Sequence, residues 1–133
     1  MESLLPLLLL ISLTSVIGLL LRAKKGVIKK ETRVKISEGE FGGKYGSRLT
    51  ILQFSTTFCS ECRTAKAIVN DVVKDFKDIV YVEVDAESNL DLVRRVDIRS
   101  TPTTIFLDSK GFEIARAKGA PKRDQLIKAI KAI

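Results

Sequence analysis

The sequence predicts a mixed α/β fold preceded by one membrane-spanning helix. Two patterns support this prediction: a long uncharged run near the N-terminus, and β-branched segments that alternate with helical stripes after residue 47. The chain has 133 residues, of which 45% are hydrophobic and 29% charged, so it is too apolar for a disordered protein. We expect one small globular domain rather than a multidomain enzyme.

The N-terminal run from Leu4 to Leu21 has no charged residue and is rich in leucine. A helix of that length spans roughly 27 Å, which is enough to cross a hydrocarbon core. The residues before the run include Glu2 and no Lys or Arg, and the run ends at Leu21 and Arg22 without a small-x-small cleavage site. We therefore expect residues 1–21 to be an uncleaved transmembrane anchor.

A basic stretch follows the apolar run. Residues 22–35 hold seven Lys or Arg and one Glu. Because cytoplasmic flanks of membrane helices carry the positive excess, we expect a single-pass protein whose domain faces the cytoplasm. Residues 22–46 are expected to form a tether whose basic side chains lie on anionic lipid, which makes nucleic acid an unnecessary partner. The alternative is a cleaved secretory signal with an extracytoplasmic domain.

The soluble part, residues 47–133, shows an ordered series of β and α patterns, after a short edge strand expected at Arg33–Ser37. The order predicts a mixed sheet, parallel where helices connect its strands and antiparallel in a late hairpin. The expected strands are Leu49–Ser55, Ile79–Asp85, Thr103–Leu107 and Phe112–Ala117, and the expected helices are Cys59–Phe76, Leu90–Arg95 and Lys122–Ile133.

The chain has only two cysteines, Cys59 and Cys62, and no histidine, which excludes a His-dependent triad and a self-contained four-ligand zinc site. The pair falls where a strand gives way to a helix. The N-terminal end of a helix stabilises a thiolate, so Cys59 is the expected nucleophile, and Cys62, one turn further on, can resolve the mixed disulfide. Three other readings remain open: a structural disulfide, half of an intermolecular zinc site, and two small buried hydrophobic residues.

From Ser47 to Ile133 the sequence resembles the thioredoxin superfamily, and in particular the membrane-anchored thioredoxin-like proteins of actinobacteria, which share the N-terminal helix, the basic flank and a Gln-Phe-Ser strand. The resemblance implies a thioredoxin fold and redox activity. It rests on the Cys59-x-x-Cys62 pair and on four segments at thioredoxin-like intervals: Val82–Asp85, Ile98–Thr103, Gly111 and Lys118–Ala120.

The resemblance also implies a substrate-binding surface. Thr101-Pro102 is expected to be a cis peptide that faces the cysteines and pairs with an extended substrate chain, and Phe58 is expected at the rim. The alternative interpretation, without the resemblance, is that Pro102 is the first residue of an edge strand. The expected partner is a protein disulfide or dithiol, with no cofactor and no metal.

Thioredoxins usually carry Trp-Cys-Gly-Pro-Cys, and this sequence departs from that pattern with Phe58-Cys59-Ser60-Glu61-Cys62. Glu61 disfavours the neighbouring thiolate and Arg63 partly offsets it, so we expect a reductant or disulfide exchanger rather than an oxidant. Gln53 replaces the buried Asp of thioredoxins and cannot accept the proton of Cys62, which predicts a slower resolving step. A membrane-tethered binding module without redox turnover is the alternative function.

Overall fold

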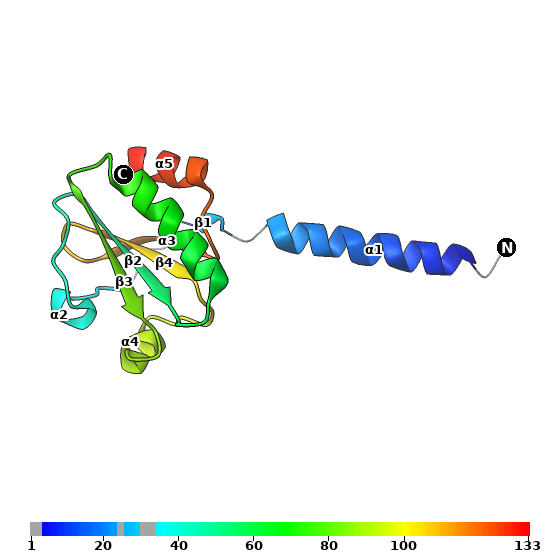
Figure 1. The fold of residues 1–133 in the computed structure, drawn as a ribbon, viewed down its shortest axis with the longest axis horizontal. Coiled ribbons are helices and arrows are strands. Elements are labelled where there is room, and N and C mark those ends of the chain that lie inside the picture. Colours follow the sequence, from blue (N-terminus) through cyan, green and yellow to red (C-terminus); the bar gives the residue numbers. More distant parts are fainter. Residues whose placement is uncertain (1–3, 24–25, 30–33) are drawn as a thin grey trace.

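The computed structural model describes residues 4–23, 26–29 and 34–133 (Figure 1). The expected short helices and strands of the soluble part are present, with small shifts at their ends. The helices are α1 (Leu4–Ala23), α2 (Glu38–Phe41), α3 (Ser60–Val73), α4 (Leu90–Arg95) and α5 (Arg123–Lys131), and the strands are β1 (Ile28–Lys29), β2 (Leu49–Ser55), β3 (Ile79–Asp85), β4 (Thr103–Asp108) and β5 (Glu113–Lys118).

The strands form one sheet in the order β1-β5-β4-β2-β3. Strand β2 runs parallel to β3 and antiparallel to β4, while β5 pairs antiparallel with β4 and β1. The predicted mixed sheet is therefore confirmed. Because β2 has a partner strand on each side and helices above and below, all seven of its residues are buried.

Two hydrophobic clusters lie on opposite faces of the sheet, because alternate residues of β2 point to opposite sides. Leu49 and Ile51 pack with Val69 and Val72 of α3 and with the inward residues of α5. Leu52 and Phe54 pack with residues of α2 and α4 on the other face. Figure 1 shows α3 and α5 together on one side of the sheet.

Residues 34–46, expected to belong to the tether, pack against the domain instead. Ile36 is fully buried and Phe41 nearly so, both in the cluster beneath α2 and α4. Helix α2 is stabilised by a capping box between Ser37 and Glu40, and the hydroxyl of Tyr45 donates to the Ile36 carbonyl at 2.7 Å. Residues 34–46 are therefore part of the folded domain, which does not begin at Ser47.

The short strand expected at Arg33–Ser37 is not formed over its described residues. Lys35 makes only an isolated antiparallel bridge with Phe112. Arg33 lies outside the described residues. Instead, β1 supplies the edge of the sheet: Ile28 pairs with Ala117, and Lys29 with Arg116.

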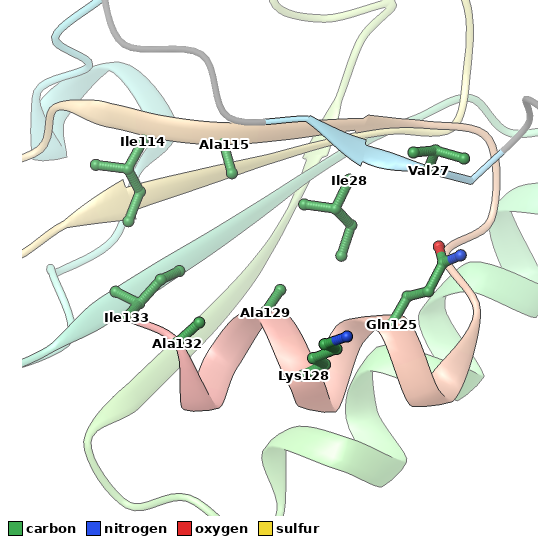
Figure 2. Close-up of a pocket in the computed structure, with 9 residues that line it drawn as sticks. All are labelled: Val27, Ile28, Ile114, Ala115, Gln125, Lys128, Ala129, Ala132 and Ile133. Carbon is green, nitrogen blue, oxygen red and sulfur yellow. The ribbon is translucent and has the colours of Figure 1, made fainter.

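An apolar hollow of about 660 Å³ opens between α5 and the edge formed by β1 and β5 (Figure 2). Val27 and Ile28 form its wall on the β1 side, and Ala129 and Ile133 lie opposite on or just after α5. Neither cysteine lines it. The hollow is therefore separate from the cysteine pair.

Helix α1 projects away from the domain, and none of its residues is buried (Figure 1). Its 20 residues are long and apolar enough to cross a membrane, although a signal sequence has the same properties. Ser12 and Thr14 donate their hydroxyls to backbone carbonyls one turn earlier, which satisfies these polar groups within the helix.

Candidate active site

The two cysteines lie at the junction of β2 and α3. Cys59 occupies the N-cap position of α3 with an extended backbone, and its sulfur accepts a hydrogen bond from the backbone N–H of Cys62 at 3.1 Å. The two residues are joined as a disulfide with an S–S distance of 2.15 Å. The sulfur of Cys59 therefore lies against the free N–H groups at the positive end of the helix, where a thiolate is stabilised.

The two cysteines differ in exposure. Cys62 is one turn inside α3 on the face that packs against the sheet, and only 3% of its surface is exposed. Cys59 is half-buried, and the preceding residue, Phe58, is fully exposed. An incoming disulfide can therefore reach Cys59 more easily than Cys62, and it meets the phenyl ring of Phe58 beside it.

The loop before β4 lies beside the loop that carries the cysteines. The Thr101–Pro102 peptide is cis, Pro102 is buried, and the Thr101 hydroxyl lies 3.4 Å from that of Thr56. This proximity follows from the pairing of β2 with β4, in which Phe54 is opposite Thr103. The antiparallel register thus brings together Thr56 and Thr101, which are 45 residues apart in the sequence.

Gln53 is fully buried on the face of β2 that points toward α3. Its amide nitrogen donates to the Ser55 hydroxyl and to the Cys62 carbonyl, both at 3.0 Å. Its amide oxygen accepts a hydrogen bond from the Tyr81 hydroxyl at 2.9 Å. The amide fixes the first turn of α3 to the sheet, but it has no basic group that could take a proton from a thiol.

Tyr81 was not identified from the sequence. Burial, with a smaller contribution from the charge of Glu83, raises the pKa of its hydroxyl, so the hydroxyl stays a proton donor to Gln53. Its position could have been inferred from the parallel pairing of β2 and β3, in which Ile51 is opposite Tyr81. Residues on the same face of adjacent strands lie within reach of each other when the side chains are long.

Glu61 and Arg63 both lie in the first turn of α3, and both are exposed. Their charges are screened by water, so their influence on the thiolate of Cys59 is smaller than that of the helix end itself. The site therefore consists of an accessible sulfur at a helix end, a buried second sulfur and an adjoining loop.

This fold and this site define a thiol–disulfide redox protein, and the comparisons with known proteins agree. The family model described as Thioredoxin matches residues 34–132. The chain belongs to the thioredoxin family. The match thus includes α2 and the buried residues Ile36 and Phe41 that precede Ser47.

Relatives of the chain include named thioredoxins. Thioredoxin from Ophiophagus hannah is 29% identical over 86 residues, which are 65% of this chain and 80% of that protein. Thioredoxin H5 from Oryza sativa subsp. japonica is 34% identical over 77 residues, which are 58% of this chain and 56% of that protein. Both matches are shorter than the segment 34–132 that the family model covers.

Solved thioredoxin structures are similar to about two thirds of the chain. A malaria parasite thioredoxin-2 superposes with a TM-score of 0.60 at 28% identity, over 65% of this chain and 84% of the other. A thioredoxin from Nicotiana alata superposes with a TM-score of 0.58 at 27% identity, over 65% and 73%. The predicted thioredoxin fold is confirmed, and thioredoxins act on protein disulfides.

The buried amide of Gln53 yields a prediction about pH. In Gln53→Glu the new carboxyl group is buried and faces the Cys62 carbonyl, so its pKa is raised above about 4.3, the value in an unfolded chain. As the pH rises, the new carboxyl group ionises in the unfolded chain before it ionises in the folded one. The free energy of unfolding therefore falls from about pH 4 until the raised pKa is reached. We expect a loss of about 1–3 kcal/mol over this range, measured by urea unfolding at pH 4 and pH 8.

Gln53→Leu is the matched control. It loses the same hydrogen bonds but cannot ionise, so its loss of stability relative to the natural chain should be the same at both pH values. Equal losses at pH 4 and pH 8 in Gln53→Glu would mean that the carboxyl group reaches water or a cation, and that Gln53 is not sealed in the core.

Proposed function

We propose that this protein is a membrane-tethered thiol–disulfide oxidoreductase that reduces or exchanges protein disulfides through Cys59 and Cys62. The observation that carries the proposal is the sulfur of Cys59 at the N-cap of α3, with Cys62 buried one turn behind it. The resemblance to membrane-anchored thioredoxin-like proteins of actinobacteria supports the same proposal.

In the first step the thiolate of Cys59 attacks one sulfur of a substrate disulfide. A bond forms between Cys59 and that sulfur, the substrate S–S bond breaks, and the other substrate sulfur leaves as a thiolate that takes a proton from water. The helix-end N–H groups, among them that of Cys62 at 3.1 Å, stabilise the attacking thiolate.

In the second step Cys62 loses its proton and attacks the sulfur of Cys59. The mixed disulfide breaks, the second substrate thiolate leaves, and the Cys59–Cys62 disulfide forms, so two electrons have moved to the substrate. Gln53 cannot accept the proton, which therefore passes to water or to the leaving thiolate. A dithiol donor regenerates the reduced pair by the reverse exchange, and no cofactor is needed.

Substrate contacts are proposed at Thr101, Pro102 and Phe58. Thr101 lies beside the cysteine loop, 3.4 Å from Thr56 between hydroxyl oxygens, so its backbone can pair with an extended chain that approaches Cys59. The exposed phenyl ring of Phe58 offers an apolar contact next to the nucleophile.

The different exposure of the two cysteines predicts different behaviour of their variants. Cys62→Ser keeps the nucleophile but removes the resolving thiol, so substrates should accumulate as mixed disulfides with Cys59. Cys59→Ser should trap none, because Cys62 is buried. Non-reducing gel electrophoresis after acid quenching measures the difference, and equal trapping, or none in either variant, favours a binding module without redox turnover.

The exposed carboxylate of Glu61 predicts the redox poise. We expect a potential near that of reducing thioredoxins, about −270 mV, and well below about −180 mV, where isomerases lie. Glu61→Gln removes a negative charge near Cys59, stabilises the reduced form and should raise the potential by on the order of 10 mV. Equilibration with glutathione measures both values.

Asp75→Asn is the matched control for that charge change. Asp75 is also exposed, but it lies beyond the end of α3 that is opposite to Cys59. Removing its negative charge should therefore leave the reduction potential unchanged. A potential above about −180 mV in the natural chain would contradict the reductant assignment.

Residues 1–21 are proposed as a single-pass anchor, with the domain on the cytoplasmic side and the basic flank on anionic lipid. The apolar length of α1 and the seven basic residues that follow it in residues 22–35 support this arrangement. No nucleic-acid contact is needed to account for these charges.

The proposed topology predicts that alkaline carbonate does not extract the protein from membranes. A C-terminal alkaline phosphatase fusion should be inactive, and a C-terminal fluorescent reporter that matures only in the cytoplasm should be bright. Moving the basic residues to the front of α1 should invert both signals. An active phosphatase fusion of the natural chain would place the domain outside.

A further inference from the structure

The chain is bound to the sheet almost immediately after the membrane helix. Helix α1 ends at Ala23, and the backbone N–H of Gly26 donates to the carbonyl of Lys118 at 2.7 Å. Three residues of chain reach at most about 11 Å, so Gly26 lies within that distance of the end of α1, and the end of β5 is one hydrogen bond further on. Strand β1 then continues the attachment by pairing Ile28 with Ala117.

Gly26 fits this attachment closely. Its φ of +77° is unfavourable for other residues, and a Cβ atom there would lie 2.3 Å from the carbonyl oxygen of Ala120. The backbones of Gly26 and Ala120 thus touch without room for a side chain. The chain after α1 is therefore held in one place at the end of β5, next to the start of the last loop.

The same peptide group that holds Gly26 also holds the loop beside the cysteines. The carbonyl of the Lys118–Gly119 peptide accepts from Gly26, and its N–H donates to the carbonyl of Pro102 at 2.8 Å. Pro102 is thus about 8 Å from Gly26 through one peptide group and two hydrogen bonds. Pro102 and its neighbour Thr101 lie against the segment that leads to Cys59.

This chain of contacts puts the cysteine site on the membrane-proximal side of the domain. Figure 1 agrees, since α1 leaves the domain on the side at which α3 begins. The exposed side chains of Lys118 and Lys122 add positive charge to the same end of β5, and Arg22 lies in the last turn of α1. Anionic lipid headgroups attract such a surface.

We propose that the cysteine site works at the bilayer surface and that its substrates are disulfides in membrane proteins, close to where their chains enter the lipid. This inference rests on the proposed tether and redox role. The substrate disulfide is reduced to two thiols while the Cys59–Cys62 dithiol becomes a disulfide, as in the exchange above. A disulfide far from the bilayer is poorly placed for the anchored site.

Orientation can be measured without any redox chemistry. Full-length protein is placed in vesicles that contain an acceptor-labelled lipid. One sample carries the donor fluorophore on Cys59 of the Cys62→Ser variant. The other carries it on the new cysteine of Lys77→Cys, in a chain that also has Cys59→Ser and Cys62→Ser. Lys77 is exposed and follows the end of α3 that is opposite to Cys59, and α3 itself is about 21 Å long. Stronger energy transfer from Cys59 is expected, and equal or weaker transfer overturns the proposal.

Substrate selection is tested with three disulfides presented to the reduced full-length protein in vesicles. Two are membrane-spanning peptides with a disulfide loop either about five or about thirty residues from the end of the span, and the third is a soluble disulfide protein. The near disulfide should be reduced faster than the far one by on the order of tenfold, because anchoring raises the local concentration only near the surface. Equal rates overturn the proposal.

Two variants separate docking from the chemistry. Gly26→Ala, and separately ten Gly/Ser residues inserted between Lys25 and Gly26, should remove the preference for the near disulfide and leave the rate with the soluble protein unchanged. Gly39→Ala is the matched control, because a Cβ atom there meets nothing within 4 Å. A preference that persists in the insertion variant overturns the inference. Failure to reduce any of the three disulfides contradicts the proposed redox function instead, while the energy-transfer result still decides orientation.

Discussion

The pairing of β2 with β4 is the contact on which the site depends. Strand β2 is buried along its whole length, and its last residues lead directly into the loop that carries the cysteines. Its antiparallel register with β4 puts Thr103 opposite Phe54, so the Thr101–Pro102 loop must lie beside that same loop. The centre of the sheet thus fixes the positions at which both loops leave it.

The core beneath the cysteines is closed by a neutral polar group. The amide of Gln53 is hydrogen-bonded to Ser55, to Tyr81 and to the Cys62 carbonyl. A buried amide thus replaces the carboxylate usual in thioredoxins, and both its nitrogen and its oxygen have partners. This arrangement favours stability over proton transfer. The same residues thus explain a well-fixed helix start, and they supply no basic group near Cys62.

Segments outside the minimal fold connect the site to its surroundings. The attachment of Gly26 to the Lys118–Gly119 peptide joins the segment after α1 to the end of β5, and β1 adds a fifth strand to the sheet. Residues 34–46 add Ile36 and Phe41 to the second core cluster. The part between the apolar helix and the central strands is therefore partly structural, and the proposed tether is shorter than its composition indicates.

The sequence by itself determined the elements whose patterns are local: the apolar run of α1, the strands β2 to β4, the stripe of α3 and the cysteines at its start. The local patterns do not predict the roles of three residues, because each role depends on a partner far away in the sequence. Ile36 packs in the cluster that includes Leu92, and Gly26 donates to Lys118. The amide of Gln53 accepts a hydrogen bond from Tyr81. Short polar and glycine-rich stretches carry little periodicity, so only the tertiary structure decided that they are packed against the sheet. Hydrogen bonds between residues far apart in the chain leave no local pattern that could reveal them.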